Sequence, residues 1–317
     1  MTRYTTRRSV LRSTGVATAL LAGVPATATA DDGWTAVETP TGNTLYDVTY
    51  TTTGAYAVGG GGIVLERTNT GWRTVIDGGP TGNGNDLYGA AVTGAGKRLW
   101  FAGASGAIGE YDVSSGVLYD HSAPNDVTNN FNDVAVTGIA DEANVYVAGD
   151  SGKIYYSFEN GATGTWDSVT PGSGSNINAI DFYDPRKGHA VDGNQTVFST
   201  GDGTTWDKMG IENADYNFYG VDSDGADDVT VSGGGGSVYN WNGSEWIRED
   251  TGDADLRDVE ADGTLALTVG SGGMIFRRRD TGWHQETTPT GENLTAVTNI
   301  GMRPEIAVGA AGTVLER

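Results

Sequence analysis

The chain has 317 residues and a formal net charge of −22 at pH 7, and it contains 50 glycines, 8 prolines and no cysteine. Abundant glycine with many Thr, Val and Tyr suits short strands joined by tight turns, so composition favours an all-β fold and excludes one held by disulfides. The acidic balance argues against nucleic acid as a partner, because a polyanion repels phosphates and no basic patch accompanies the aromatic residues.

The first thirty residues have the pattern of an export signal. Arg7 and Arg8 stand just ahead of a short apolar stretch, residues 15–24, and small residues 28–30 precede Asp31. Adjacent arginines in this position are typical of substrates of the twin-arginine exporter, and the apolar stretch is too short to span a bilayer. We therefore expect a signal peptide over residues 1–30, cleaved near Ala30, and a secreted domain over residues 31–317 without membrane insertion.

Lysine is rare, and acidic residues are spread along the whole chain. Removal of the leader also removes four arginines and no acid, which leaves the mature chain more acidic still. An Asp-rich, Lys-poor surface keeps a protein hydrated in concentrated salt, where screening removes most of the self-repulsion. These features predict a halophilic, archaeal source.

A glycine turn of the form Gly-x-x-Gly-x-(Ile/Val) recurs along the chain. Successive copies lie about 37 to 46 residues apart, the length of one four-stranded propeller blade. A seventh copy, residues 192–197, is degenerate. The other six begin at Gly59, Gly103, Gly149, Gly233, Gly270 and Gly309.

A second repeated element, here called the inner-strand motif, precedes each glycine turn by about a dozen residues. Its four positions are apolar, variable, small or Asp, and apolar. An aromatic residue follows each turn except the last, so each repeat predicts four strands with the inner-strand motif innermost. The seven motifs begin at Leu45, Leu87, Phe131, Ile177, Phe218, Leu256 and Leu294.

These repeats predict an all-β, seven-bladed β-propeller, and the chain ends indicate how it closes. Residues 312–317 stop short of the aromatic strand that follows the first turn, and the missing piece stands at residues 31–37 around Trp34. We expect this N-terminal strand to complete the last blade, which removes the exposed sheet edges that would template aggregation.

The fourth repeat, residues 182–206, carries a family resemblance. Its glycine turn and the hairpin STGDGTTW, residues 199–206, resemble the repeat of the photosystem II assembly and stability factor propellers, within the bacterial neuraminidase repeat group; the hairpin is similar to an Asp-box with its acid displaced by one position. The resemblance spans residues 31–317 as a pattern and implies a non-catalytic binding scaffold.

A binding scaffold of this kind would use the ring face formed by the glycine turns and interblade loops, where variable residues project. The candidates on this face are Asn129, Asn130, Asp150, Lys153, Asn194 and Gln195.

Residues 221–229 include the spacing Asp-x-Asp-Gly that suits a calcium loop, with Asp222, Asp224 and Asp227 as candidate ligands. Carboxylates on a sharp glycine turn can surround a hard cation. The segment stands where other repeats have an ordinary hairpin and lacks the distal glutamate, so an acidic hairpin is the favoured interpretation and a structural Ca²⁺ the alternative. No other cofactor is expected.

Arg277, Arg278 and Arg279 form the one dense basic run. On a strand, Arg277 and Arg279 would share a face and Arg278 would lie opposite. We interpret the run as a solvated charge run on an edge strand, with docking of an acidic partner as the alternative.

Catalytic patterns are missing from the sequence. Similar repeats occur in sialidases, but the arginines fall mostly outside the inner strands, and His121, His189 and His284 lie in three different repeats without metal-ligand spacing. We therefore predict a secreted, monomeric, non-catalytic propeller that binds an extracellular protein or glycan. An extracellular carbohydrate-active hydrolase or lyase is the alternative, and a metal-stabilised surface-layer component a third option. Carboxylates and arginines clustered at one mouth of the ring would favour an enzyme.

Overall fold

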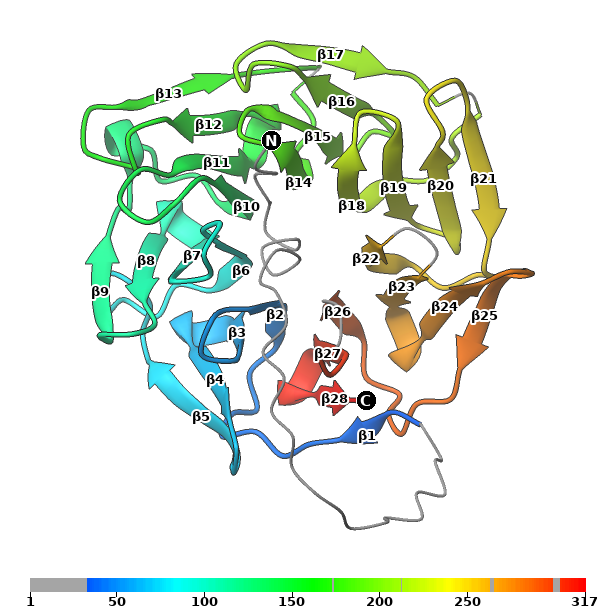
Figure 1. The fold of residues 1–317 in the computed structure, drawn as a ribbon, viewed down its shortest axis with the longest axis horizontal. Helices are drawn as coiled ribbons and strands as arrows, with labels where there is room; N and C mark the ends of the chain where they lie inside the picture. Colours follow the sequence, from blue (N-terminus) through cyan, green and yellow to red (C-terminus); the bar gives the residue numbers. More distant parts are fainter. Residues whose placement is uncertain (1–32, 173, 212, 263–264, 299–302) are drawn as a thin grey trace, which may run out of the picture.

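The computed structural model describes residues 33–172, 174–211, 213–262, 265–298 and 303–317. Over these residues the chain forms seven four-stranded antiparallel sheets arranged as blades around a central axis (Figure 1). The predicted seven-bladed β-propeller is confirmed. The expected signal peptide, residues 1–30, lies outside the described residues.

Blades 1 to 4 each consist of four strands that are consecutive in sequence, and the inner-strand motif lies on the innermost strand as predicted. Blade 1 contains β2 (Leu45–Tyr50), β3 (Ala55–Gly59), β4 (Val64–Thr68) and β5 (Gly71–Ile76), and blade 2 contains β6 (Leu87–Val92), β7 (Arg98–Gly103), β8 (Ile108–Asp112) and β9 (Val117–Asp120). Blade 3 contains β10 (Phe131–Thr137), β11 (Asn144–Gly149), β12 (Ile154–Ser157) and β13 (Trp166–Val169), and blade 4 contains β14 (Ile177–Asp184), β15 (Lys187–Asp192), β16 (Val197–Thr200) and β17 (Trp206–Met209).

The remaining blades repeat this order, except that the last one takes its outer strand from the start of the chain. Blade 5 contains β18 (Phe218–Gly225), β19 (Asp228–Gly233), β20 (Ser237–Trp241) and β21 (Trp246–Asp250), and blade 6 contains β22 (Leu256–Asp262), β23 (Leu265–Gly270), β24 (Ile275–Arg279) and β25 (Gly282–Glu286). Blade 7 contains β26 (Leu294–Thr298), β27 (Ile306–Gly309), β28 (Val314–Glu316) and β1 (Thr35–Ala36).

Closure of the ring is as predicted. In β1, Thr35 lies opposite Glu316 and Ala36 opposite Leu315 of β28, in antiparallel register. The Val37 amide extends this ladder by donating to the Val314 carbonyl at 2.9 Å. Figure 1 shows the first strand lying outside the last one of the chain.

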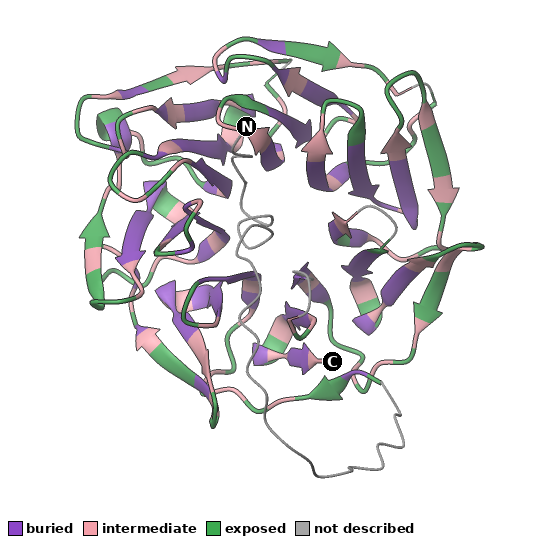
Figure 2. Cartoon of the chain, viewed as in Figure 1, coloured by how far each residue is buried: buried purple, intermediate pink, exposed green. Residues whose placement is uncertain are grey.

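The hydrophobic core is divided among the seams between neighbouring blades. At the seam of blades 2 and 3, for example, Trp100 of β7 packs with Phe131 of β10 and Val145 of β11. Burial is concentrated on the inner strands, whereas the outermost strands are largely exposed or half-buried (Figure 2). This pattern follows from the ring geometry, because neighbouring blades lie closest together near the axis and diverge outwards. Within the described residues, the structure contains no helix that could span a lipid bilayer.

The glycine turns need a left-handed residue at their fourth position. Most contain a short 3-10 turn: η1 (Gly60–Gly62), η2 (Ala104–Gly106), η4 (Asp150–Gly152), η5 (Ser271–Gly273) and η6 (Ala310–Gly312), whereas η3 (Pro124–Asp126) lies in an interblade loop. Gly62 has φ of 74°, which glycine adopts without steric cost. In the degenerate copy Gln195 takes φ of 61° instead. There the Asp192 carboxylate supports the turn by accepting the Asn194 and Thr196 amides at 2.9 Å.

Candidate functional site

A cavity of about 500 Å³ lies where the inner strands begin, and residues from all seven blades line it. It is therefore on the ring face that carries the glycine turns, since the turn residue Ala310 is part of the lining. This central cavity is the candidate site. Its polar and aromatic lining comes mainly from the second and third positions of the inner-strand motifs.

A β-bulge in every blade positions the second residue of the inner-strand motif. In blade 1 the pairing register between β2 and β3 shifts between Leu45 and Asp47, so Tyr46 has no direct partner on β3. The same shift recurs at the equivalent position of the other six blades. A bulge re-aims a side chain out of the regular alternation. The seven bulged residues, all lining the cavity, are Tyr46, Tyr88, Asn132, Asn178, Tyr219, Arg257 and Thr295.

Three of these bulged residues bond the next blade rather than presenting all of their polar groups to the cavity. The Asn132 amide donates to the Ile177 carbonyl at 3.0 Å, and the Asn178 amide donates to the Phe218 carbonyl at 2.6 Å. The Thr295 hydroxyl donates to the Leu45 carbonyl at 2.6 Å, across the closure of the ring. These contacts hold neighbouring blades in register at the rim.

The aromatic bulged residues form two groups. The Tyr46 and Tyr88 rings meet edge to face with centroids 5.0 Å apart. Arg257 places its guanidinium carbon 4.3 Å from the Tyr219 ring centroid, a cation–π contact, and its Nη2 lies 3.1 Å from the Asp255 carboxylate. The rim therefore offers one tyrosine pair and one tyrosine already covered by the chain's own cation.

Carboxylates at the third motif position clamp adjacent blades together. Asp47 accepts the Val48 amide at 2.8 Å and, from the next blade, the Ala90 amide at 2.7 Å. Asp133 repeats this with the amides of Val134 and Ile180, and Asp258 accepts the Val297 amide. The blade after each of these aspartates has Gly89, Ala179 or Ala296 at the same position. The alternation of Asp with a small residue was visible in the sequence, but its meaning was missed.

A second repeated clamp joins the glycine turns. The residue just before the inner-strand motif is Asp or Asn in six of the seven repeats. In blade 2, the Asp86 side chain accepts the Gly61 amide from the blade 1 turn at 2.8 Å, and its carbonyl accepts the Ala104 amide from its own blade's turn at 2.8 Å. The side-chain bond recurs at Asn130, Asn176, Asp255 and Asn293.

The electrostatics of the tyrosine pair reflect this clamp. Burial raises the pKa of Tyr46, and the nearby Asp86 carboxylate adds to the increase. Burial, then Asp86, also raises the pKa of Tyr88, with a further contribution from Asp150. Both hydroxyls therefore stay protonated, and negative charge lies close to them.

The predicted binding-face residues lie on the face of the cavity, but part of their hydrogen-bonding capacity is used internally. Asn130 accepts the Ser105 amide and donates to Asp150 at 3.1 Å, and Asn132 donates to the other Asp150 oxygen at 3.2 Å. Asp150 and Lys153 belong to the glycine turn of blade 3, and Asn194 and Gln195 belong to that of blade 4. Asn129 is exposed in the loop that leads into β10. None of the six is among the described lining residues of the cavity, and their role stays a prediction.

The candidate calcium ligands occupy a β-hairpin. Asp222 and Asp224 lie on β18, where Asp222 is buried opposite Thr230, and Asp227 lies in the turn before β19. Among the described residues, no group of three His, Cys, Asp or Glu side chains is placed to hold a metal ion. The structure therefore does not bring the three aspartates together as a ligand set.

The basic run is placed differently from the expectation. As predicted, Arg277 and Arg279 share a face and reach Glu286, while Arg278 points to Glu249 in blade 5. However, β24 is an interior strand between β23 and β25, so the expected edge position is wrong, and of the three arginines only Arg279 is exposed. Only 8% of Arg277 is exposed. The sequence pattern could not reveal this, because its partners come from distant segments.

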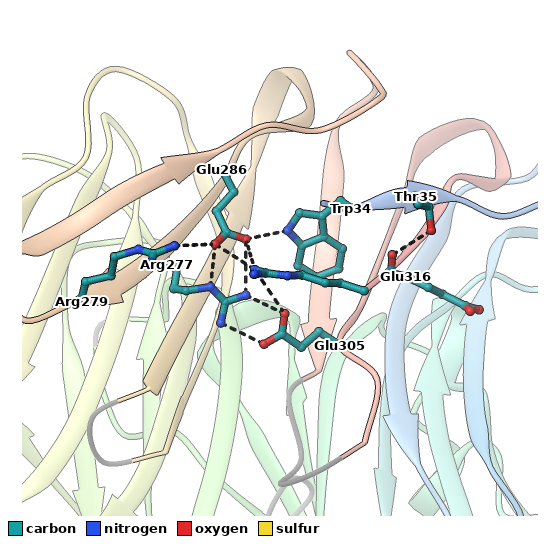
Figure 3. Close-up of polar contacts among 8 residues, drawn as sticks. Trp34, Thr35, Arg277, Arg279, Glu286, Glu305 and Glu316 are labelled. Atoms are coloured by element: carbon teal, nitrogen blue, oxygen red, sulfur yellow. Dashed lines mark hydrogen bonds and ion pairs between the residues drawn. The ribbon is translucent and has the colours of Figure 1, made fainter. Parts of the chain in front are cut away.

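Arg277 is the centre of an ion-pair cluster that includes the closing strand (Figure 3). It donates to Glu286 at 2.6 Å and to both oxygens of Glu305 at 2.9 and 2.6 Å. The Trp34 indole donates to Glu286 at 2.8 Å, and Arg317 pairs with the same carboxylate at 2.8 Å. Arg277 thus serves closure of the ring and is not free to dock an acidic partner.

The residues needed for the enzymatic alternatives are dispersed. His121 contacts Glu110 at 3.2 Å in blade 2, and His189 is buried against Ser223 at 2.7 Å with a pKa lowered by burial to about 4. His284, on the outer strand β25, contacts Thr281 in the turn before it. The described lining of the cavity contains no histidine and one arginine, Arg257. Its aspartates, Asp47, Asp133 and Asp258, would by themselves favour an enzyme, but each accepts a main-chain amide of the next blade.

Comparison with known proteins bears on the fold alone. No family model matches the chain, and no curated protein matches it by sequence. Solved structures with a similar fold include YCF48 from Cyanidioschyzon merolae, with a TM-score of 0.69, 16% identity and coverage of 90% of this chain and 98% of that one. YCF48 bound to D1 peptide gives a TM-score of 0.70 at 14% identity, covering 89% and 94% of the two chains.

An enzyme is also among the similar structures. Virginiamycin B lyase from Staphylococcus aureus has a TM-score of 0.73 at 12% identity and covers 89% of this chain and 97% of that one. The chain therefore shares its fold both with a peptide-bound propeller and with a lyase. The fold does not choose between binding and catalysis.

Proposed function

We propose that this chain is a secreted, non-catalytic β-propeller that binds a segment of an extracellular protein in its central cavity. The observation that carries the proposal is the cavity lining, in which a bulge in each blade turns one side chain inward. The bulged residues include three tyrosines, an arginine and two asparagines, and they stand over aspartates that already accept main-chain amides. Tyrosine and arginine are the residues that most often anchor protein interfaces.

The state of the aspartates supports binding over catalysis. A general base must offer its carboxylate to a substrate proton, whereas Asp47 and Asp133 each accept one amide from their own strand and one from the next blade. Releasing either carboxylate would break the register between blades. The peptide-bound YCF48 structure, which shares the fold, fits this proposal.

A second candidate is an extracellular hydrolase or lyase, because carboxylates and an arginine do meet at the cavity and a lyase shares the fold. A histidine-to-alanine variant of that lyase, also solved, is catalytically inactive. In this chain the described cavity lining has no histidine to fill such a role. This difference favours the binding proposal.

Export through the twin-arginine pathway and a salt-rich habitat are parts of the same proposal. They rest on Arg7 and Arg8 ahead of the apolar leader and on the acidic, lysine-poor composition. Detection of a product that begins near Asp31 in the medium, and its loss when both arginines become lysine, would test the export step.

The binding test uses residues 31–317 in concentrated KCl against arrays of short peptides and of glycans, with mass analysis for any product. We expect specific peptide binding that Tyr219→Ala and Arg257→Ala weaken about tenfold or more. Tyr119→Ala is the matched control, because Tyr119 is an exposed tyrosine on the outer strand β9 and should leave binding unchanged. Turnover of an array member, or binding only to glycans, would contradict the proposal.

A further inference from the structure

We infer that the Tyr46 and Tyr88 pair receives a lysine or arginine side chain of the bound segment. The inference rests on the proposed function and adds the chemistry of the partner. The two rings lie on adjacent blades at the rim of the cavity, half-buried, with their edge-to-face contact at 5.0 Å. Such a pair presents a π face, which attracts a cation through the ring quadrupole.

The same rim contains a cation–π contact of this kind within the chain itself. Between blades 5 and 6 the Arg257 guanidinium covers the Tyr219 ring at 4.3 Å and pairs with Asp255 at 3.1 Å. Asp255 is the residue just before the inner-strand motif, and its side chain accepts the Gly235 amide of the preceding turn. Tyrosine, cation and clamp aspartate thus form one unit at this seam.

Blades 1 and 2 have the tyrosines and the clamp aspartate of this unit. Asp86 precedes its motif as Asp255 does, and one of its oxygens accepts the Gly61 amide at 2.8 Å. Its charge is felt by both tyrosines, since it contributes to the raised pKa of each. Among the arginine–aromatic contacts of the described residues, none involves Tyr46 or Tyr88.

The charge of the cavity selects the sign of the ligand. Its described lining contains three aspartates and one basic residue, Arg257, which is committed to Tyr219 and Asp255. At contact distance, where salt screens partly buried groups least, a cation at the tyrosine pair would complement both the rings and Asp86, whereas an acidic side chain would be repelled. A neutral aliphatic side chain would contact the rings but carry no charge to complement Asp86.

The test measures binding of capped Gly-Ser peptides that differ only in a central Lys, Arg, Leu or Glu. We expect the Lys and Arg peptides to bind about tenfold tighter than the Leu peptide. Tyr46→Leu and Tyr88→Leu should weaken the Lys peptide about fivefold to tenfold and change the Leu peptide less than about twofold. Tyr46→Phe and Tyr88→Phe, which keep the rings, should stay within about threefold of the unmodified chain.

The variant Asp86→Asn removes the negative charge but keeps the hydrogen bond to the turn, because the side-chain amide oxygen can still accept the Gly61 amide. We expect it to weaken the Lys and Arg peptides about threefold or more without changing the melting temperature by more than a degree or so. If Leu or Glu peptides bind as well as Lys peptides and respond to Tyr219→Ala, the inference is wrong and the binding proposal stands. If no peptide binds whatever its central residue, both are wrong.

Discussion

Two seams of the ring are built from different chemistry. Between blades 3 and 4 the core is aromatic: Tyr146 stacks on Phe182 with centroids 3.8 Å apart, and Trp206 meets Phe182 edge to face at 5.9 Å. Between blades 6 and 7 the core is mainly aliphatic with one aromatic, Trp34, and an ion-pair cluster around Arg277 lies over it.

The difference reflects what each seam has to achieve. The strands of blades 3 and 4 are all consecutive in sequence, so none of them has to find a partner strand from a distant part of the chain, and packing between the blades is sufficient. Blade 7 must recruit a strand from the other end of the chain, and β1 and β28 span only two and three residues. So short a ladder specifies its partner strand and register only weakly. The hydrogen bond from Trp34 to Glu286 adds a directional contact that favours the correct strand.

The largest expected effect comes from removing the closing strand. A chain lacking residues 31–39 should lose more than about 5 kcal/mol of stability, because the Trp34 burial and the β1 ladder disappear and the β28 edge is exposed. The loss should appear as a single lower melting transition for the whole ring, measured by calorimetry. A synthetic peptide of residues 31–39 added in trans should raise the melting temperature, and independent early melting of blade 7 alone would contradict the prediction.

Arg277→Met should cost about 3 to 5 kcal/mol, because it leaves the largely buried Glu286 and Glu305 without their main partner. Chemical denaturation measures the loss. The double variant Arg277→Met with Glu286→Gln should recover part of it, since one buried charge is then removed as well. A cost below about 1 kcal/mol for Arg277→Met would mean that the cluster is a surface ion pair in energetic terms.

Two tryptophans at equivalent places in their blades provide a matched comparison. Trp34 and Trp206 are similarly buried, but Trp34 donates to Glu286 at 2.8 Å, whereas the Trp206 indole nitrogen has no hydrogen-bond partner among the described residues. Trp34→Phe should therefore cost about 1.5 to 3 kcal/mol more than Trp206→Phe, the value of a hydrogen bond to a charged group. Equal costs in urea unfolding would show that packing alone holds the closing strand.

Acid should weaken the closure seam and leave the aromatic seam unaffected. Burial opposes ionisation of Glu286, but bonds from Arg277 and Trp34 and the charge of Arg317 outweigh it and lower its pKa. A lowered pKa in the folded state stabilises the fold at neutral pH, and this contribution is lost as pH falls through the ordinary glutamate value of about 4.3 and below.

The corresponding measurement is the melting temperature between about pH 7 and pH 3.5. The gap between the unmodified chain and Glu286→Gln should narrow on acidification, because the unmodified side chain becomes protonated. The penalty of Phe182→Leu should stay constant, because the stack of its ring on Tyr146 does not depend on a carboxylate. A gap that widens in acid would have the wrong sign for this account.

The sequence by itself determined the number of blades, the order of strands within each and the closure by the strand around Trp34. These depend on local patterns, because alternation, turn residues and repeat spacing act within some forty residues. The sequence also contains the alternation of Asp with Gly or Ala at the third motif position, but the pattern alone did not indicate that these aspartates join neighbouring blades.

The tertiary structure decided what the polar residues do. Asp47 is a clamp because the ring brings the Ala90 amide to it, and Arg277 is buried because Glu286 and Glu305 converge on it. The central cavity exists only when seven bulges meet around one axis. Contacts between blades join residues about forty or more positions apart, and no local periodicity encodes which side chains will face each other there.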